Sequence, residues 1–256
     1  MSSTVNGLFK YLCELAPLEL QMDFDNSGFL IGRGEAVVNC ALLALDVTSE
    51  VIDEAIEKKA ELIISHHPVF LHAIKAITDQ DPDQQRLLRL IEHKIACISM
   101  HTNLDIAQGG VNDVLLGLFG IRSECALDED GCGRIGEVDA PMPMEDFLAL
   151  CRKRLHTNGL RYHDAGRPVK RLAVMGGSGG DSVERAAALG CDTYLTADIK
   201  YHQFLLAKEL GINLIDGDHF CTENPVIDNM AVRLRQEFPD VRFLISQRHH
   251  QTARFY

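Results

Sequence analysis

Histidine and carboxylate side chains follow several short apolar stretches of this sequence. Two pairs are spaced four residues apart, Asp198 with His202 and His219 with Glu223, and on a helix that spacing puts both side chains on one face. Imidazole nitrogen and carboxylate oxygen are ligands for borderline divalent metals. The sequence therefore offers enough ligands for two ions, with a carboxylate to bridge them. The other candidate ligands are His66, His67 and Asp105.

Each of these residues also has an ordinary structural interpretation. A histidine after a strand commonly caps a loop, and a His-x-x-x-Glu pair commonly lies on a solvated helix face. Two adjacent histidines after a buried strand are harder to explain in that way. Structural metal sites favour cysteine ligands, which this set lacks, so a reactive metal is favoured over a structural one.

Three other motifs are weaker candidates. The glycines of Gly176–Gly180 could present N–H groups to a phosphate, but the motif lacks the Lys-Ser/Thr of a P-loop, so we predict a tight strand-to-helix turn. Cys221 lies near His219, yet it fits equally well as a buried thiol at a helix start. His249 and His250 are predicted to lie on a solvated C-terminal tail.

The elements that must position these residues alternate between short apolar strands and amphipathic helices. Continuous apolar strands separated by helices predict mainly parallel sheets covered on both faces, and ligands collect at the carboxyl ends of such strands. The predicted strands are 29–32, 40–45, 62–65, 95–100, 171–175, 192–196, 213–215 and 241–245. The predicted helices are 5–15, 49–59, 83–93, 111–119, 145–155, 182–189, 201–210 and 223–238.

A segment rich in glycine and proline, 131–143, interrupts this alternation. We therefore predict two α/β domains, residues 1–125 and 126–256, with the C-terminal segment able to pack back on the first. The strand–helix–strand order that ends at Ser65–His67 recurs in the order that ends at Thr196–Asp198. This correspondence suggests an internal duplication.

The composition excludes several classes of protein. Hydrophobic residues make up 46% and charged residues 24% of the 256 residues, as in a globular protein with a sizeable core. A net charge of -12 without a basic patch disfavours nucleic acid and anionic membranes as partners. The 8 cysteines are scattered without Cys-x-x-Cys spacing, and no apolar run is long enough for a membrane span. We expect a cytoplasmic protein with reduced thiols.

Five motifs occur in the order seen in one known family. They are Asp25-Asn26-Ser27-Gly28, Ser65-His66-His67-Pro68, His101-Thr102-Asn103-Leu104-Asp105, Asp198-Ile199-Lys200-Tyr201-His202 and His219-Phe220-x-x-Glu223. In these motifs the chain resembles the GTP cyclohydrolase 1 type 2 homologs, also called NGG-interacting-factor-three-like dinuclear metal proteins, over nearly its whole length. The chain is too short for the domain that longer members insert between their two halves.

The resemblance implies a two-metal site in the cleft between two α/β domains, and assembly into a ring-like homohexamer. Either Asp105 or Glu223 would be the bridging carboxylate, and Zn, Mn, Fe, Ni or Co would suit the ligands. The implied ligands are His66, His67, Asp105, His219 and Glu223. The residues implied to orient these ligands or to contact a substrate are Asp25, Ser27, Asn103, Asp198 and His202.

Three positions near these motifs depart from the family pattern. Phe24 stands where the family commonly has Trp, Ala197 where it has Gly, and Asp218 where it commonly has Gly. Asp218 adds a carboxylate beside the predicted site, where it could strengthen metal binding or face solvent. The ending, 247–256, also differs from the family pattern.

Two functions from different classes remain open. Two ions with nitrogen and oxygen ligands can activate water and stabilise charge on a phosphoryl or ring carbonyl oxygen. This chemistry predicts a metal-dependent hydrolase of a nucleotide or another phosphorylated small molecule, with GTP ring opening suggested by the family name. The alternative is a metal-binding or scaffold protein without turnover, since no general base is evident outside the ligand set.

Overall fold

The computed structural model describes residues 3–256, which form two compact units. Unit 1 contains the chain up to Gln108 together with Ile227–His250, and unit 2 contains Gly109–Val226 together with Gln251–Tyr256. Each unit therefore includes residues that are far apart in the sequence. The domain boundary predicted between residues 125 and 126 lies inside unit 2.

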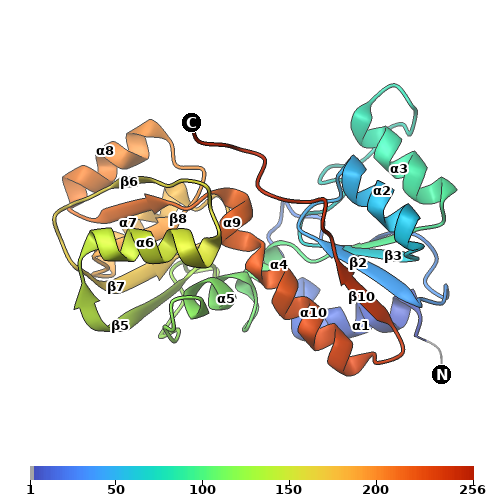
Figure 1. The fold of residues 1–256 in the computed structure, drawn as a ribbon, viewed down its shortest axis with the longest axis horizontal. Coiled ribbons are helices and arrows are strands. Elements are labelled where there is room, and N and C mark those ends of the chain that lie inside the picture. Colours follow the sequence, from blue (N-terminus) through green and yellow to red (C-terminus); the bar gives the residue numbers. More distant parts are fainter. Residues whose placement is uncertain (1–2) are drawn as a thin grey trace. The chain divides into compact units, whose positions relative to one another are not determined.

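Unit 1 is built on a five-stranded sheet with the strand order β1-β4-β3-β2-β10 (Figure 1). The strands from β4 to β10 are parallel to their neighbours, whereas β1 pairs antiparallel with β4 at one edge. The bounds of the strands are Gly28–Ile31 for β1, Cys40–Ala44 for β2, Leu62–Ser65 for β3, Ala96–Ser99 for β4 and Arg242–Ile245 for β10.

Helices cover both faces of this sheet. The helices α2 and α3 pack on one face, where Ile52 and Leu90 join the apolar side chains of β2 and β3. The helices α1 and α10 lie on the other face (Figure 1). Thr4 caps α1 by accepting a hydrogen bond from the Gly7 N–H, and Pro17 follows its end. The bounds are Val5–Leu15 for α1, Ser49–Lys58 for α2, Pro82–Glu92 for α3, Thr102–Ile106 for α4 and Pro225–Glu237 for α10.

Unit 2 is built on a second five-stranded sheet with the order β5-β7-β8-β9-β6. The central strands β7, β8 and β9 are parallel, and both edge strands pair antiparallel with their neighbours. The bounds of the strands are Arg134–Met142 for β5, Arg161–His163 for β6, Val169–Val174 for β7, Thr193–Thr196 for β8 and Asn213–Asp216 for β9.

Helices α5 and α6 contribute to the core on one face of this second sheet, where Leu116 and Phe147 contact the side chains of β7 and β8. Helices α7 and α8 contact each other and the parallel strands. The bounds are Val111–Gly117 for α5, Met144–Leu155 for α6, Val183–Ala188 for α7, Tyr201–Leu210 for α8 and His219–Glu223 for α9.

Four strands of each sheet share the same topology. In unit 1 the order β1-β4-β3-β2 places an antiparallel strand beside the last of three parallel strands, and in unit 2 the order β6-β9-β8-β7 does the same. The antiparallel strand comes first along the chain in both cases. This shared topology supports the internal duplication that the sequence suggested, and both sheets are of the mixed α/β type.

One sequence prediction about the elements is wrong, and one predicted helix is preceded by a short helix that the sequence did not indicate. The segment 131–143 was expected to interrupt the alternation, but most of it is the edge strand β5, in which Ile135 and Val138 are buried. Its proline is compatible with an edge, where one side of the strand needs no ladder hydrogen bonds. The predicted helix 223–238 corresponds to α10, and a separate short helix, α9, precedes it and ends at Glu223, because Pro225 has no N–H to continue it. Within residues 3–256, no helix is long and apolar enough to cross a membrane.

Candidate metal centre

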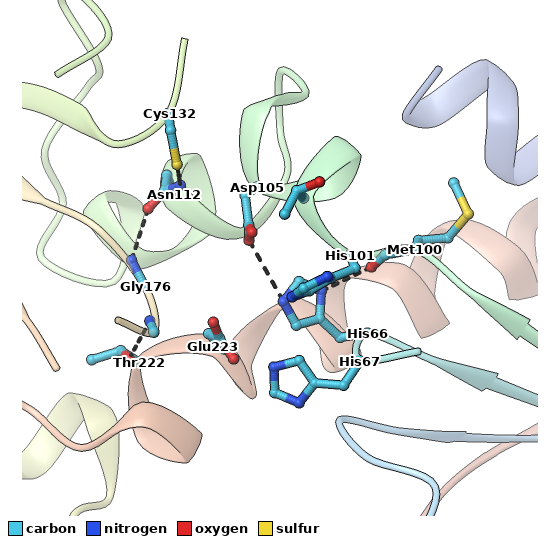
Figure 2. A network of polar contacts seen from close by, with 12 residues as sticks. His66, His67, Met100, His101, Asp105, Asn112, Cys132, Gly176, Thr222 and Glu223 are labelled. Atoms are coloured by element: carbon cyan, nitrogen blue, oxygen red, sulfur yellow. Dashed lines mark hydrogen bonds and ion pairs between the residues drawn. The ribbon is translucent and has the colours of Figure 1, made fainter. Parts of the chain in front are cut away.

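Strand register in unit 1 brings histidines together at the carboxyl ends of the parallel strands. Ser65 at the end of β3 pairs with Ser99 at the end of β4, so His66 emerges beside Met100 and His101. The side chain of His66 is fully buried, and its Nδ1 donates a hydrogen bond of 2.8 Å to the Met100 carbonyl oxygen (Figure 2). This bond fixes the tautomer, so the lone pair lies on Nε2. That nitrogen is 3.6 Å from Asp105 Oδ1.

His67 is held by a carboxylate from the neighbouring strand. Ala44 at the end of β2 pairs with Ser65, so Asp46 and His67 lie two residues beyond the paired ends. His67 Nδ1 donates to Asp46 Oδ1 at 2.7 Å. Burial raises the pKa of Asp46, but hydrogen bonds from His249 and His67 outweigh that effect and hold the pKa well below its ordinary value. Asp46 is therefore an anion that orients the His67 ring.

His101 completes a cluster of three imidazoles. Its ring centroid lies 5.2 Å from that of His66 and 5.4 Å from that of His67. One nitrogen of each ring lies within 4.8 Å of the others, a spacing that would suit shared metal ligation. His101 Nδ1 donates to Asp25 Oδ1 at 2.7 Å. Each histidine of this cluster thus donates a hydrogen bond from Nδ1 to an oxygen atom.

Asp25 is the centre of its own hydrogen-bond network. It accepts bonds from the Ser27 hydroxyl at 2.7 Å and from the Thr102 N–H at 3.0 Å, in addition to His101. Burial raises the pKa of Asp25, but the hydrogen bonds from His101, Thr102 and Ser27 outweigh it and hold that pKa well below its ordinary value. Asp25 and Ser27 therefore hold His101 in position through hydrogen bonds.

Unit 2 brings together a second group on the short helix α9. His219 and Glu223 lie four residues apart on this helix, with Nε2 and Oε2 3.0 Å apart. His219 Nδ1 donates to Asp198 Oδ2 at 2.7 Å, so Asp198 orients His219 rather than pairing with His202. Burial lowers the pKa of His219, but hydrogen bonds and charge from Glu223 and Asp198 outweigh it and raise the pKa to about 9. The two carboxylates thus favour a positive charge at this position.

The glycine-rich loop forms a wall beside this second group. Its N–H groups donate to protein side chains, Gly176 to Asn112 Oδ1 at 2.9 Å and Gly177 to Thr222 Oγ1 at 3.1 Å (Figure 2). The loop is therefore the tight turn predicted from the sequence, and these two N–H groups are not presented to a phosphate. A side chain at Gly177 would approach Glu223 Oε1 to 2.1 Å, so glycine is required for the close packing.

The two residues beside His219 have structural functions. Asp218 has a φ of 72° and caps α9, with its side chain accepting a hydrogen bond from the Cys221 N–H at 3.1 Å. The extra carboxylate at this position is thus used to start the helix. Burial raises the pKa of the Cys221 thiol to about 12, which fits a core thiol and not a nucleophile.

Two of the residues suggested from the sequence lie elsewhere. Asn103 is buried and donates from Nδ2 to the Ala16 carbonyl oxygen at 2.7 Å, which fastens α4 to the end of α1. His202 lies exposed on α8. Neither placement resembles that of Asp25, Ser27 or Asp198, whose side chains contact a histidine or its backbone.

Sequence reasoning missed three residues that lie in or beside the unit 1 cluster. His101 opens one of the family motifs but was not placed among the candidate site residues. Asp46 follows β2 in the same way that His66 follows β3, and this position at a strand end is the signal that could have identified it. His249 was predicted to lie on a solvated tail, which is wrong: its side chain is only 12% exposed and donates to Asp46.

The donor set fits divalent metal ions. Each of the histidines proposed as ligands donates from Nδ1 to a carboxylate or carbonyl oxygen, the arrangement by which metal-binding imidazoles are commonly oriented. The neighbouring carboxylates, Asp105 in unit 1 and Glu223 in unit 2, supply hard oxygen ligands. Each unit therefore contains a candidate metal-binding group of imidazole and carboxylate.

The chain is similar to known proteins over most of its length. The model of the family Duf34/NIF3 (NGG1p interacting factor 3) matches residues 3–252. A protein of Clostridium perfringens named GTP cyclohydrolase 1 type 2 homolog is 34% identical over 251 residues, which cover 95% of this chain and 96% of that protein. A protein of the same name from Methanocaldococcus jannaschii is 30% identical over 220 residues, which cover 84% of this chain and 88% of that protein.

Solved structures show the same fold. The crystal structure of a hypothetical protein of Staphylococcus aureus has a TM-score of 0.92 at 28% identity, with 100% of both chains covered. Reduced HcgD from Methanocaldococcus jannaschii has a TM-score of 0.86 at 27% identity, with 96% of this chain and 99% of that chain covered. Since the family model matches nearly every residue of the sequence, this protein belongs to the Duf34/NIF3 family.

Proposed function

We propose that this protein binds two divalent metal ions and uses them to hydrolyse a nucleotide or another phosphorylated small molecule. The observation that supports this most is that His66, His67 and His219 each donate from Nδ1 to an oxygen, so Nε2 is the nitrogen that can bind a metal ion, which at His219 would displace the proton that Glu223 and Asp198 favour. The five proposed ligands are His66, His67, Asp105, His219 and Glu223. Zn, Mn, Fe, Ni and Co all suit such ligands.

Two bound ions would supply Lewis acidity and would lower the pKa of a bound water molecule toward neutrality. The residues of the chain contribute the remaining requirements of hydrolysis. His101 is hydrogen-bonded to Asp25 through Nδ1, so its Nε2 is the atom that can accept a proton. We assign to His101 the movement of a proton during the reaction, because its hydrogen bond to Asp25 fixes which ring nitrogen faces away from that carboxylate. Asp25 then serves to hold the ring in place.

The test begins with metal content. Elemental analysis of the dialysed protein should give about two divalent ions per chain. His66→Ala and Glu223→Ala should each lower that number, whereas His93→Ala, an exposed histidine at the end of α3, should leave it unchanged. A wild-type protein that retains no metal, or a His66→Ala variant with full occupancy, would contradict the ligand set.

The hydrolase activity is tested separately from metal binding. Metal-loaded protein is assayed for released phosphate and for ring opening with a panel of nucleotides, beginning with GTP because relatives carry the name GTP cyclohydrolase 1 type 2 homolog. His101→Ala should lose turnover, and its metal content, measured in parallel, distinguishes the loss of a proton carrier from the loss of a third imidazole ligand. Metal binding without turnover on any compound of the panel would refute the hydrolase and favour a metal-binding or scaffold protein.

We further propose that the protein is a cytoplasmic homo-oligomer, a hexamer by its family resemblance. Within residues 3–256, no disulfide links any of the eight cysteines, as expected in a reducing compartment. Helix α8 exposes several apolar side chains, among them Tyr201 at 78% and Leu205 at 46%, beside Tyr162 of β6 at 53%. An exposed apolar helix face of this kind is typical of an interface, and a second copy of the chain is the partner we propose.

A further inference from the structure

The C-terminal segment Ser246–His250 runs on from β10 toward the proposed metal ligands of unit 1. Strand β10 lies parallel to β2, with Ile245 paired to Leu43, so the residues after β10 emerge at the same sheet edge as those after β2. The Ser246 N–H donates to the Leu43 carbonyl oxygen at 2.8 Å and continues the ladder by one residue. The segment therefore reaches the level of Asp46.

Acidic side chains of α2 fasten this segment to unit 1. Glu54 is only 3% exposed and accepts hydrogen bonds from the Ser246 hydroxyl at 2.6 Å and from the Gln247 N–H at 3.1 Å. Arg248 forms an ion pair with Glu57. A buried carboxylate that accepts two hydrogen bonds is costly to separate from its donors, so the segment is held in a defined position.

His249 completes the attachment at Asp46. Its Nε2 donates to Asp46 Oδ2 at 2.7 Å, while the other oxygen of the same carboxylate, Oδ1, accepts from His67 Nδ1 at 2.7 Å. The His249 side chain is 12% exposed, whereas that of Asp46 is 40% exposed. The carboxylate of Asp46 is therefore held from both sides by imidazoles, one of them a proposed metal ligand.

We propose that His249 is a positioning residue for the metal centre, which acts on His67 through Asp46. A carboxylate with one partner and 40% exposure can rotate and exchange that partner for water, but a second hydrogen bond on Oδ2 restricts the rotation. His249 thereby keeps Oδ1 on His67 Nδ1 and keeps the Nε2 lone pair directed to the metal position. This inference rests on the proposed metal-binding function, and it makes the C-terminal segment part of the site.

Metal affinity is the first measurement, with Co²⁺ as the probe and the metal-free full-length protein as the sample. His249→Ala should weaken Co²⁺ binding by about 10-fold and change the visible absorption of the bound ion, because outer partners of ligating histidines contribute about 10- to 100-fold. His249→Gln places an amide donor near the same position and should restore the affinity to within about threefold of wild type. His250→Ala alters the adjacent, exposed histidine and should have no effect.

The second measurement does not depend on metal. The ¹⁵N shifts of the His67 ring in metal-free protein should show the proton on Nδ1, and in His249→Ala that proton should exchange faster with water. Thermal unfolding of each variant shows whether the fold persists, and the ring signals report on any variant that is folded. If His249→Ala altered the fold, the Co²⁺ affinity and the His67 ring signals of His249→Gln would be compared with those of His250→Ala instead.

The inference is overturned if the His67 ring signals and the Co²⁺ affinity are the same in His249→Ala as in wild type. It is also overturned if His249→Gln binds Co²⁺ as weakly as His249→Ala. A wild-type protein that takes up no Co²⁺ would refute the proposed metal-binding function, while the His67 ring signals would still decide whether His249 positions that ring.

Discussion

Replacement of Gly177 by alanine tests whether the Glu223 carboxylate requires a glycine at this position of the glycine-rich loop. The added Cβ would lie 2.1 Å from Glu223 Oε1, 3.0 Å from its Cδ and 3.2 Å from His219 Nε2. Ordinary contact between such atoms requires about 3.4 Å, so the carboxylate must move by roughly 1 Å. Glu223 is 4% exposed, which leaves little room for that movement.

The magnitude has two parts. The positive φ of 65° at this position makes any side chain unfavourable by about 1–2 kcal/mol. The displacement of Glu223 is a separate effect on metal binding, because ligand distances tolerate only about 0.2 Å. We therefore expect Gly177→Ala to weaken metal binding by about 10- to 100-fold.

Gly211→Ala is a matched control, since Gly211 has the same φ of 65° and no atom within 4 Å of the added Cβ. Both variants should lose free energy of unfolding from backbone strain, and Gly177→Ala should lose more because its Cβ also displaces Glu223, as measured by urea denaturation of the metal-free protein. Isothermal titration with Zn²⁺ should then separate them, with wild-type affinity in Gly211→Ala only. Equal Zn²⁺ affinities in the two variants would refute the packing argument.

Three further predictions concern acid stability, the core and assembly. Because the folded pKa of Asp25 is lowered from its ordinary 3.8, this residue stabilises the metal-free protein above about pH 4, and that contribution is lost as the pH falls through the lowered folded pKa. Urea unfolding as a function of pH should therefore show a shallower acid loss in Asp25→Asn than in wild type, and parallel curves would contradict the assignment. Tyr194 is fully buried and donates from its hydroxyl to the Gly179 carbonyl oxygen at 2.7 Å, so Tyr194→Phe should lower the free energy of unfolding by about 1–3 kcal/mol. An unchanged free energy of unfolding would show that water replaces this hydrogen bond. Leu205→Glu on α8 should reduce the molar mass measured by light scattering, and an unchanged mass would place the assembly surface elsewhere.

Local patterns in the sequence were sufficient for most of the elements. The predicted helix 5–15 matches α1, Val5–Leu15, because its apolar residues recur at helical spacing and Pro17 follows. The parallel strands were found for a similar reason, since each is a short apolar run such as Leu62–Ser65. The edge strand β5 was missed because a strand exposed on one side needs no such run, and glycine and proline mask its pattern.

The metal ligands were also proposed from sequence, because their residue types and order resemble a family whose motifs are short and continuous. Adjacent histidines at a strand end and a His-x-x-x-Glu spacing on a helix are local features, so they need no knowledge of the fold. For Asp198 the spacing was misleading, because it suggested a pair with His202 while the carboxylate bonds to His219.

Only the tertiary structure decided which side chains hold the histidines in place. Asp46 meets His67 because β2 and β3 are paired in register. His249, 203 residues beyond Asp46, joins them because β10 returns to lie parallel to β2. Asp25 meets His101 across 76 residues in the same manner. These contacts depend on strand order and register, which are set by packing of the whole sheet and not by any residue near the histidines in the sequence.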